Sequence, residues 1–201
     1  QISEKSNSFQ ARLLKPQVPC HITGYFQSYK YFTTVDSLLR TQFDPVEALS
    51  NYGLSVLKEI EKAPHSCSIH VRRGDYLLKK NSNHPVLTEQ YYSRSIESYL
   101  KEFDSIQFFV FSDDADWVQK QSWAKDVAVI SNGTKRKPHE DIKLMSACSH
   151  NIISNSTFSW WGAWLNENQK KCITAPRNWV EDKEQNAAIY EHLIPMKWQL
   201  I

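Results

Sequence analysis

The sequence is poor in glycine and has none of the glycine-rich motifs that hold nucleotides. Only 5 of its 201 residues are glycine. It contains neither the GxxxxGK[ST] phosphate loop nor the GxGxxG dinucleotide fingerprint, and it lacks the GxSxG nucleophile elbow. These absences argue against a P-loop enzyme, a dinucleotide-dependent enzyme of the usual type and an α/β-hydrolase.

Metal-binding patterns are missing as well. The four cysteines are widely spaced, with no CxxC pair and no zinc pattern: Cys20, Cys67, Cys148 and Cys172. We therefore expect free, buried thiols rather than disulfides or a metal site. The acidic run Asp113–Asp116 falls on a predicted strand-to-helix turn, where Asp114 and Asp116 are expected to be solvated. No metal cofactor is predicted.

Charge and hydropathy argue against two further classes. The formal net charge is +2, which does not favour a nucleic-acid partner, so any affinity for anions must be local. No apolar run approaches the ~20 residues of a transmembrane helix, and no signal-peptide core is present. The hydrophobic fraction of 41% and the seven tryptophans indicate a globular chain. Because the first residue is Gln1, we expect a processed chain or one whose start is missing.

From residue 64 onward, the predicted strands and helices alternate. Ile106–Phe111 contains the continuous apolar run Phe108–Phe111, which is typical of a strand buried on both faces. Strands are expected over 66–71, 106–111, 127–130, 151–154 and 172–175, and helices over 88–103, 114–123, 140–149, 157–166 and 186–193. This order predicts an α/β fold, with a Rossmann-like parallel sheet and helices on both faces.

The segment before residue 64 is predicted to be separate from this sheet. Residues 1–33 are polar and irregular. Asp44-Pro45-Val46-Glu47 reads as a helix start, with Asp44 as the N-cap, Pro45 in the first turn and Glu47 reaching back. The helix is expected to continue to about Lys62, before Pro64. We therefore divide the chain into 1–63 and 64–201.

The most informative stretch is His70-Val71-Arg72-Arg73-Gly74-Asp75, directly after a predicted strand. Two adjacent arginines would not both sit inside a strand, because one would then face the core unpaired. Arginine in a loop at the carboxyl end of a strand favours a phosphate or carboxylate ligand. Since neighbouring side chains point to opposite faces, one arginine should meet the ligand while the other pairs internally. The alternative is an ordinary surface loop in which both arginines pair with acids such as Asp75.

Three further polar clusters follow strands: Ser112–Asp114, Ser131–Gly133 and Asn155–Thr157. In a parallel sheet these strand ends share one edge, so the clusters could line one crevice. Ser156, Thr157 and Ser159 open a helix and could bind phosphate or simply cap it. Asp113 could accept two hydrogen bonds from a guanine, or cap the next helix, a role that Asp114 suits better. His70 could face the base or be a core imidazole.

The tryptophan-rich helix is expected to belong to the core. Phe158, Trp161 and Leu165 recur at helical spacing, as do Trp160 and Trp164, which predicts packing on two sides of a buried helix. Stacking of Trp160 on a sugar is the less favoured alternative. The basic run Lys135–Lys137 is expected to be a solvated loop.

At this point the sequence resembles a known family, the α-1,2-fucosyltransferases of glycosyltransferase family 11 in their bacterial form. The resemblance rests on the order and spacing of four blocks between about Gly24 and Pro176: residues 24–32, 70–76, 111–114 and 155–165. Its implications are transfer of L-fucose from GDP-β-L-fucose to the 2-hydroxyl of a galactose, with inversion, on a GT-B-like fold of which this chain would be the donor-binding half.

The resemblance also implies roles for single residues. Arg72 corresponds to the arginine that clamps the β-phosphate, and Asp75 is expected to position it; these two are the predicted catalytic residues. His70 and Asp113 correspond to the guanine-facing pair. The loop that wraps the diphosphate corresponds to Ser156, Thr157, Phe158 and Ser159. Asp141 matches a motif position without an assigned role, and the reaction is expected to be metal-independent.

The family's glycine-rich N-terminal segment, resembling Gly-Gly-Leu-Gly-Asn-Gln, has no counterpart here. Residues 1–63 would then be a helical remnant of the acceptor half. The expected partners are GDP-fucose and a galactose-containing surface glycan, in the cytoplasm or at the inner face of the membrane, because a glycan at the Asn155 sequon would block the site. The alternatives are a GDP-sugar-binding fragment without turnover, or a GDP-fucose-dependent transferase with another acceptor.

Overall fold

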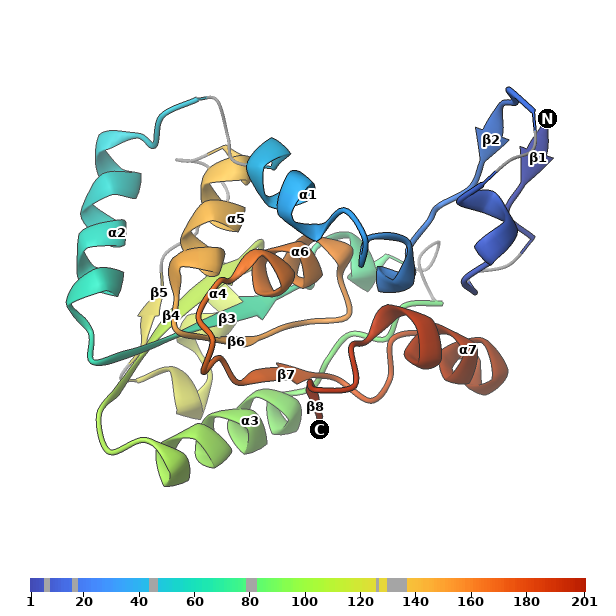
Figure 1. The fold of residues 1–201 in the computed structure, drawn as a ribbon. Helices are drawn as coiled ribbons and strands as arrows, with labels where there is room; N and C mark the ends of the chain where they lie inside the picture. The colour runs from blue at the N-terminus through green and yellow to red at the C-terminus, as the bar shows by residue number, and fades with distance from the viewer. Residues whose placement is uncertain (6–7, 16–17, 44–46, 79–82, 126, 130–136) are drawn as a thin grey trace.

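The computed structural model describes the whole chain except residues 6–7, 16–17, 44–46, 79–82, 126 and 130–136 (Figure 1). At its centre is a six-stranded sheet in the order β5-β4-β3-β6-β7-β8, and every neighbouring pair is parallel. The strands are β3 (His65–Val71), β4 (Ile106–Ser112), β5 (Ala128–Val129), β6 (His150–Ile152), β7 (Ile173–Ala175) and β8 (Gln199–Leu200). Ile130, the expected end of β5, and the cluster 131–133 lie outside the described residues.

Helices cover both faces of this sheet (Figure 1). They are α2 (Asn51–Lys62), α3 (Glu89–Glu102), α4 (Ala115–Gln119), α5 (Pro138–Ala147), α6 (Thr157–Leu165) and α7 (Lys183–Leu193), with short turns η3 (Asp75–Leu77) and η5 (Ser122–Ala124). None of the helices in the described part of the chain has the length and apolar character needed to cross a bilayer. The predicted α/β class and Rossmann-like parallel sheet are confirmed.

The alternation of side chains along the strands divides the core. From β3, Cys67, Ile69 and Val71 pack in one cluster with α3. On the opposite face, Phe109 and Phe111 of β4 pack with α2 and α5. A third cluster joins α6, α7 and β7 around Trp160. Alternate residues of β4 thus enter different clusters, which is the burial on both faces that its continuous apolar run predicts.

The strand order places a topological switch between β3 and β6. The chain moves outward from β3 through β4 to β5, then returns to the other side of β3 and continues through β6, β7 and β8. Counted from β3, this is the order 3-2-1-4-5-6 of a Rossmann fold, which binds ligands outside the carboxyl ends of the two strands at the switch. Ile69 pairs with Ile152 in the sheet register, so the two strand ends are neighbours.

The N-terminal region consists of short elements. They are β1 (Ile2–Ser3), η1 (Ala11–Leu13), β2 (Ile22–Thr23), η2 (Tyr29–Tyr31) and α1 (Asp36–Gln42). β1 and β2 form a two-stranded parallel sheet. Phe32 packs against the α6–α7 cluster, and Lys30 Nζ lies 3.3 Å from His192 Nδ1. The division of the chain at residue 64 stays a prediction.

The predicted start of α2 is wrong. Residues 47–50 are not helical, and the helix begins at Asn51, with the Ser50 hydroxyl accepting a hydrogen bond from the Gly53 amide at 3.1 Å. The cause lies in α5: the buried carboxylate of Glu140 accepts hydrogen bonds from the Ser50 amide (2.5 Å) and hydroxyl (3.1 Å). A buried carboxylate needs such donors, so this contact fixes Ser50 as the N-cap.

All four cysteines are free, as expected. Cys67 and Cys148 are buried in the core. Cys20 and Cys172 are only partly buried, so the prediction of buried thiols is right for two of the four.

Candidate functional site at the carboxyl edge of the sheet

The two arginines after β3 have different environments. The Arg73 side chain is only 16% exposed, and its Nε lies 3.1 Å from Asp114 Oδ2. Its guanidinium also lies over the ring of Trp117, 4.2 Å from the centroid. The Arg72 side chain is 36% exposed, with Nη2 2.6 Å from Asp75 Oδ1 and Nη1 3.0 Å from Asp113 Oδ2. Both arginines are therefore paired with acids, as the surface-loop alternative expects, and they differ in exposure, with Arg73 enclosed and Arg72 more exposed at the edge. A ligand role for Arg72 stays a prediction.

Asp113 organises this arginine loop. Its Oδ1 accepts a hydrogen bond from the Arg73 amide at 2.9 Å, while Oδ2 pairs with Arg72. A Cβ atom on Gly74 would lie 2.8 Å from that Oδ2, so a larger residue here would displace this carboxylate. Both carboxylate oxygens thus face the loop, and recognition of a guanine by Asp113 stays a prediction. Asp114 caps α4 by accepting the Trp117 amide at 3.0 Å, as expected.

His70 connects the two strands at the switch. Its Nδ1 lies 2.7 Å from the Ser154 hydroxyl, which follows β6, and its ring lies 5.5 Å from that of Phe158. Burial, with a smaller contribution from the charge of Arg72, lowers the pKa of His70 to about 3. The imidazole is therefore neutral at physiological pH. Its burial fits the core alternative, and its role toward a base stays a prediction.

The turn from β6 into α6 supplies the second half of the edge. The Ser156 hydroxyl accepts the Phe158 amide at 3.3 Å, which confirms the capping role. Ser159 is fully buried, and its hydroxyl donates to the backbone carbonyl oxygens of Ser154 and Ser156. Of the four residues expected to wrap a diphosphate, Ser159 therefore faces inward, Thr157 is exposed, and Ser156 and Phe158 are partly buried.

Ser154 and Asn155 hold the site together through hydrogen bonds that the sequence did not predict. Asn155 is only 1% exposed, and its Nδ2 donates to the carbonyl oxygens of Pro85 (2.9 Å) and Trp179 (3.1 Å). This nitrogen is the glycosylation point of the sequon, so a glycan there is incompatible with the fold. The available signal was two polar residues immediately after a buried apolar strand.

The remaining candidates lie elsewhere. Trp160 is 2% exposed and its Nε1 donates to the Leu193 carbonyl at 2.8 Å, which confirms core packing and excludes sugar stacking in this conformation. Asp141 lies in the first turn of α5. Lys137 forms a largely exposed ion pair with Glu47 at 2.5 Å, as a solvated loop predicts, while residues 135–136 lie outside the described part.

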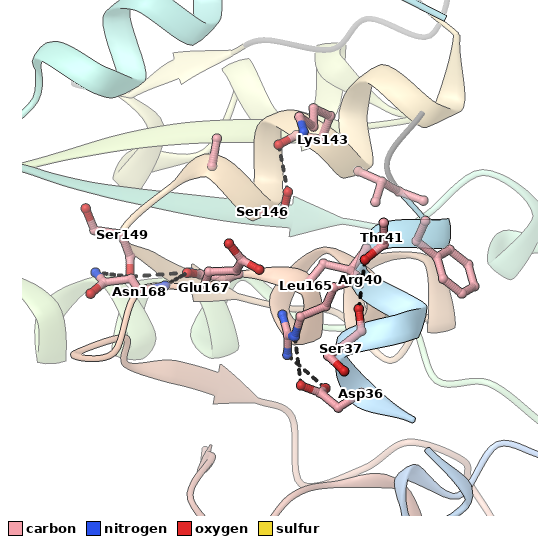
Figure 2. Close-up of a pocket in the computed structure, with 14 residues that line it drawn as sticks. Asp36, Ser37, Arg40, Thr41, Lys143, Ser146, Ser149, Leu165, Glu167 and Asn168 are labelled. Carbon is pink, nitrogen blue, oxygen red and sulfur yellow. Dashed lines mark hydrogen bonds and ion pairs between the residues drawn. The ribbon is translucent and has the colours of Figure 1, made fainter. Parts of the chain in front are cut away.

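A cavity of about 830 Å³ lies at the other end of α6, between α1 and α5 (Figure 2). Figure 2 shows the Arg40 guanidinium pointing at Asp36 in this cavity. The cavity wall includes Ser149, which precedes β6, and Asn166–Asn168, which follow α6. These residues belong to the amino edge of the sheet, so this cavity is separate from the arginine loop.

No group of three or more His, Cys, Asp or Glu side chains that could hold a metal ion occurs within the described residues. Metal independence stays a prediction.

Comparisons with known proteins point to one family. The family model of glycosyl transferase family 11 matches residues 5–199. An α-1,2-colitosyltransferase of Escherichia coli is 38% identical over 82% of this chain and 57% of its own length. The O-antigen biosynthesis glycosyltransferase WbnK of the same species is 35% identical over 78% of this chain and 54% of its own.

A galactoside 2-α-L-fucosyltransferase of Caenorhabditis elegans is 24% identical over 87% of this chain and 50% of its own length. The chain thus spans about half the length of these relatives. A family model that matches nearly the whole sequence identifies the protein: this chain belongs to glycosyl transferase family 11.

Proposed function

We propose that this chain binds GDP-β-L-fucose at the carboxyl edge between β3 and β6, and that the protein transfers L-fucose to the 2-hydroxyl of a galactose in a glycan. The observation that carries the proposal is the placement of Arg72 and the start of α6 on the two neighbouring strand ends of the switch. A diphosphate at this point would meet a guanidinium and the amides of a helix N-terminus together.

Arg72 has the donors that this role requires. A guanidinium carries five N–H groups, and the pairs with Asp75 and Asp113 engage its two terminal nitrogens. Those carboxylates hold the fork in place and leave further N–H groups to donate to a phosphate oxygen. In this proposal Asp75 acts as a positioning residue for Arg72.

The chemistry is an inverting displacement. The galactose 2-hydroxyl oxygen attacks C1 of fucose, the bond from C1 to the β-phosphate oxygen breaks, and GDP leaves with the bonding electrons. The hydroxyl proton is released to a base that we do not assign. Negative charge grows on the β-phosphate during this step, and Arg72 together with the α6 amides is placed to stabilise it. The neutral His70 helps to keep this edge rigid by bonding to Ser154.

Colitosyl transfer is a second candidate, because the colitosyltransferase relative is 38% identical over most of the chain. Colitose is L-fucose without its 3-hydroxyl, so the diphosphate contacts proposed above would serve either donor. Only a contact between the site and the hydroxyl on C3 of fucose would therefore distinguish the two donors.

We also propose that the protein works on the cytoplasmic side of the membrane, on a surface glycan. The buried Asn155 amide supports this compartment, because N-glycosylation of that sequon would oppose folding. A chain that binds GDP-sugar without turnover is the remaining alternative, because we assign none of the described residues to binding the acceptor.

The test offers the chain GDP-fucose or GDP-colitose with lactose, and measures both released GDP and trisaccharide. A fucosylated product supports the main proposal, and a colitosylated product alone supports the second. Tight GDP binding without either product supports the binding fragment. Arg94→Ala is the matched control for Arg72→Ala, because Arg94 is an exposed arginine of α3. An Arg72→Ala variant with wild-type GDP affinity would contradict all three.

A further inference from the structure

Tyr76 follows the arginine loop and has no role in the function proposed above. It lies in η3 and is half-buried. The Arg72 guanidinium carbon lies 5.7 Å from the centroid of the Tyr76 ring, within the range of a cation–π contact. The same ring is stacked on His84, with centroids 5.2 Å apart and planes at 17°. The orientation of the ring is therefore fixed beside Arg72.

The hydroxyl of Tyr76 reaches the other half of the site. It donates to the backbone carbonyl of Asn155 at 3.0 Å. Asn155 immediately precedes Ser156, the N-cap of α6. One side chain thus contacts the guanidinium after β3 and the backbone that leads into the helix after β6.

The accepting carbonyl belongs to a well-anchored residue. The side-chain Nδ2 of Asn155 donates to the carbonyl oxygen of Pro85, in the loop before α3, and to that of Trp179, in the segment after β7. Three loops of the carboxyl edge therefore meet at Asn155, so its carbonyl is a fixed point for the Tyr76 hydroxyl.

We propose that Tyr76 is a positioning residue that holds Arg72 at a set separation from the N-terminus of α6, so that both contact one diphosphate. This inference rests on the proposed function. Tyr76 belongs to none of the three core clusters that the structure describes. Its removal should therefore change the geometry of the edge more than the stability of the fold.

The test measures the affinity for GDP and for GMP by calorimetry. Tyr76→Phe keeps the ring but loses one neutral hydrogen bond, so we expect GDP to bind about two- to tenfold more weakly. Tyr76→Leu also loses the ring and should weaken GDP binding further. GMP lacks the β-phosphate, so its affinity should change little in either variant. Tyr25→Phe is the control, because the Tyr25 side chain is 83% exposed in the N-terminal region.

A double-mutant cycle separates positioning from a general structural effect. If Tyr76 acts through Arg72, Tyr76→Phe should have no further effect on GDP affinity in an Arg72→Ala background. An equal loss in both backgrounds, or wild-type GDP affinity in Tyr76→Phe, would overturn the inference.

Amide hydrogen exchange provides a readout that needs no ligand. Tyr76→Phe should speed exchange in both Arg72–Tyr76 and Ser156–Phe158. Unchanged exchange in both segments overturns the inference on its own. A wild-type chain that binds no GDP, but shows the expected change in exchange, would instead overturn the proposed function and leave only the mechanical link between the two loops.

Discussion

Replacing Arg72 by alanine tests the site most sharply, because its neighbour Arg73 provides an internal comparison. A hydrogen bond to a charged group contributes about 1.5–3 kcal/mol, so Arg72→Ala should weaken GDP binding roughly ten- to a hundredfold. The variant also leaves Asp75 and Asp113 without the cation that they share. Their charges should repel the phosphates, which pushes the loss toward the upper end of this range.

The two substitutions should affect stability in the opposite order, with the larger loss at Arg73. Arg72 is partly exposed, and ion pairs of that kind contribute about 0–1 kcal/mol. Arg73 is more buried, is paired with Asp114 and lies over Trp117. Its loss should lower the free energy of unfolding by about 1–3 kcal/mol.

Calorimetry with GDP and urea unfolding of both variants measure the two effects. The ratio of wild-type to Arg72→Ala affinity should shrink when salt is raised from about 0.1 M to 1 M, because the Debye length falls from about 10 Å to 3 Å. Unchanged GDP affinity in a folded Arg72→Ala variant, or equal effects of both substitutions on affinity, would refute the division of roles between the arginines.

Three further predictions follow from the geometry. Gly74→Ala should weaken GDP binding, because its Cβ would displace the Asp113 carboxylate. Gly53→Ala, within α2, is the control and should leave calorimetric affinity unchanged. His70 has a pKa of about 3 in the folded chain against 6.5 as its ordinary value, so the unfolded chain binds more protons between these pH values and acid destabilises the fold. Between pH 7 and pH 5 this protonation should lower the free energy of unfolding by about 2 kcal/mol. Urea unfolding of the His70→Asn variant should not show this loss. Trp160→Phe should lower the free energy of unfolding by about 1–3 kcal/mol, because the Leu193 carbonyl loses its donor. The GDP affinity of the folded variant should equal that of the wild type. Weaker GDP binding at unchanged stability would point instead to a ligand contact.

Much of the fold could be predicted from the sequence because the strands are strongly marked. The apolar run of β4 identifies a buried strand, and the polar residues that follow β3, β4 and β6 show where these strands end. Since parallel strands end at one edge, His70, Arg72, Asp113 and Ser156 could be assigned to one edge before any coordinates were known.

The remaining features depend on contacts between distant residues. Ser50 became the N-cap of α2 through Glu140, 90 positions away in the sequence. The bond between His70 and Ser154 joins residues 84 positions apart. β8 is only two residues long, and α1 is a helix of seven residues without a buried side chain. Neither element has enough apolar periodicity to be recognised from a single sequence.

The most direct test of the account is a crystal structure of the chain with GDP. We predict the β-phosphate within ~3 Å of an Arg72 guanidinium nitrogen and of an amide in the first turn of α6, at the edge between β3 and β6. A diphosphate bound elsewhere, for example in the cavity beside Arg40, with no contact to Arg72, would contradict the central claim.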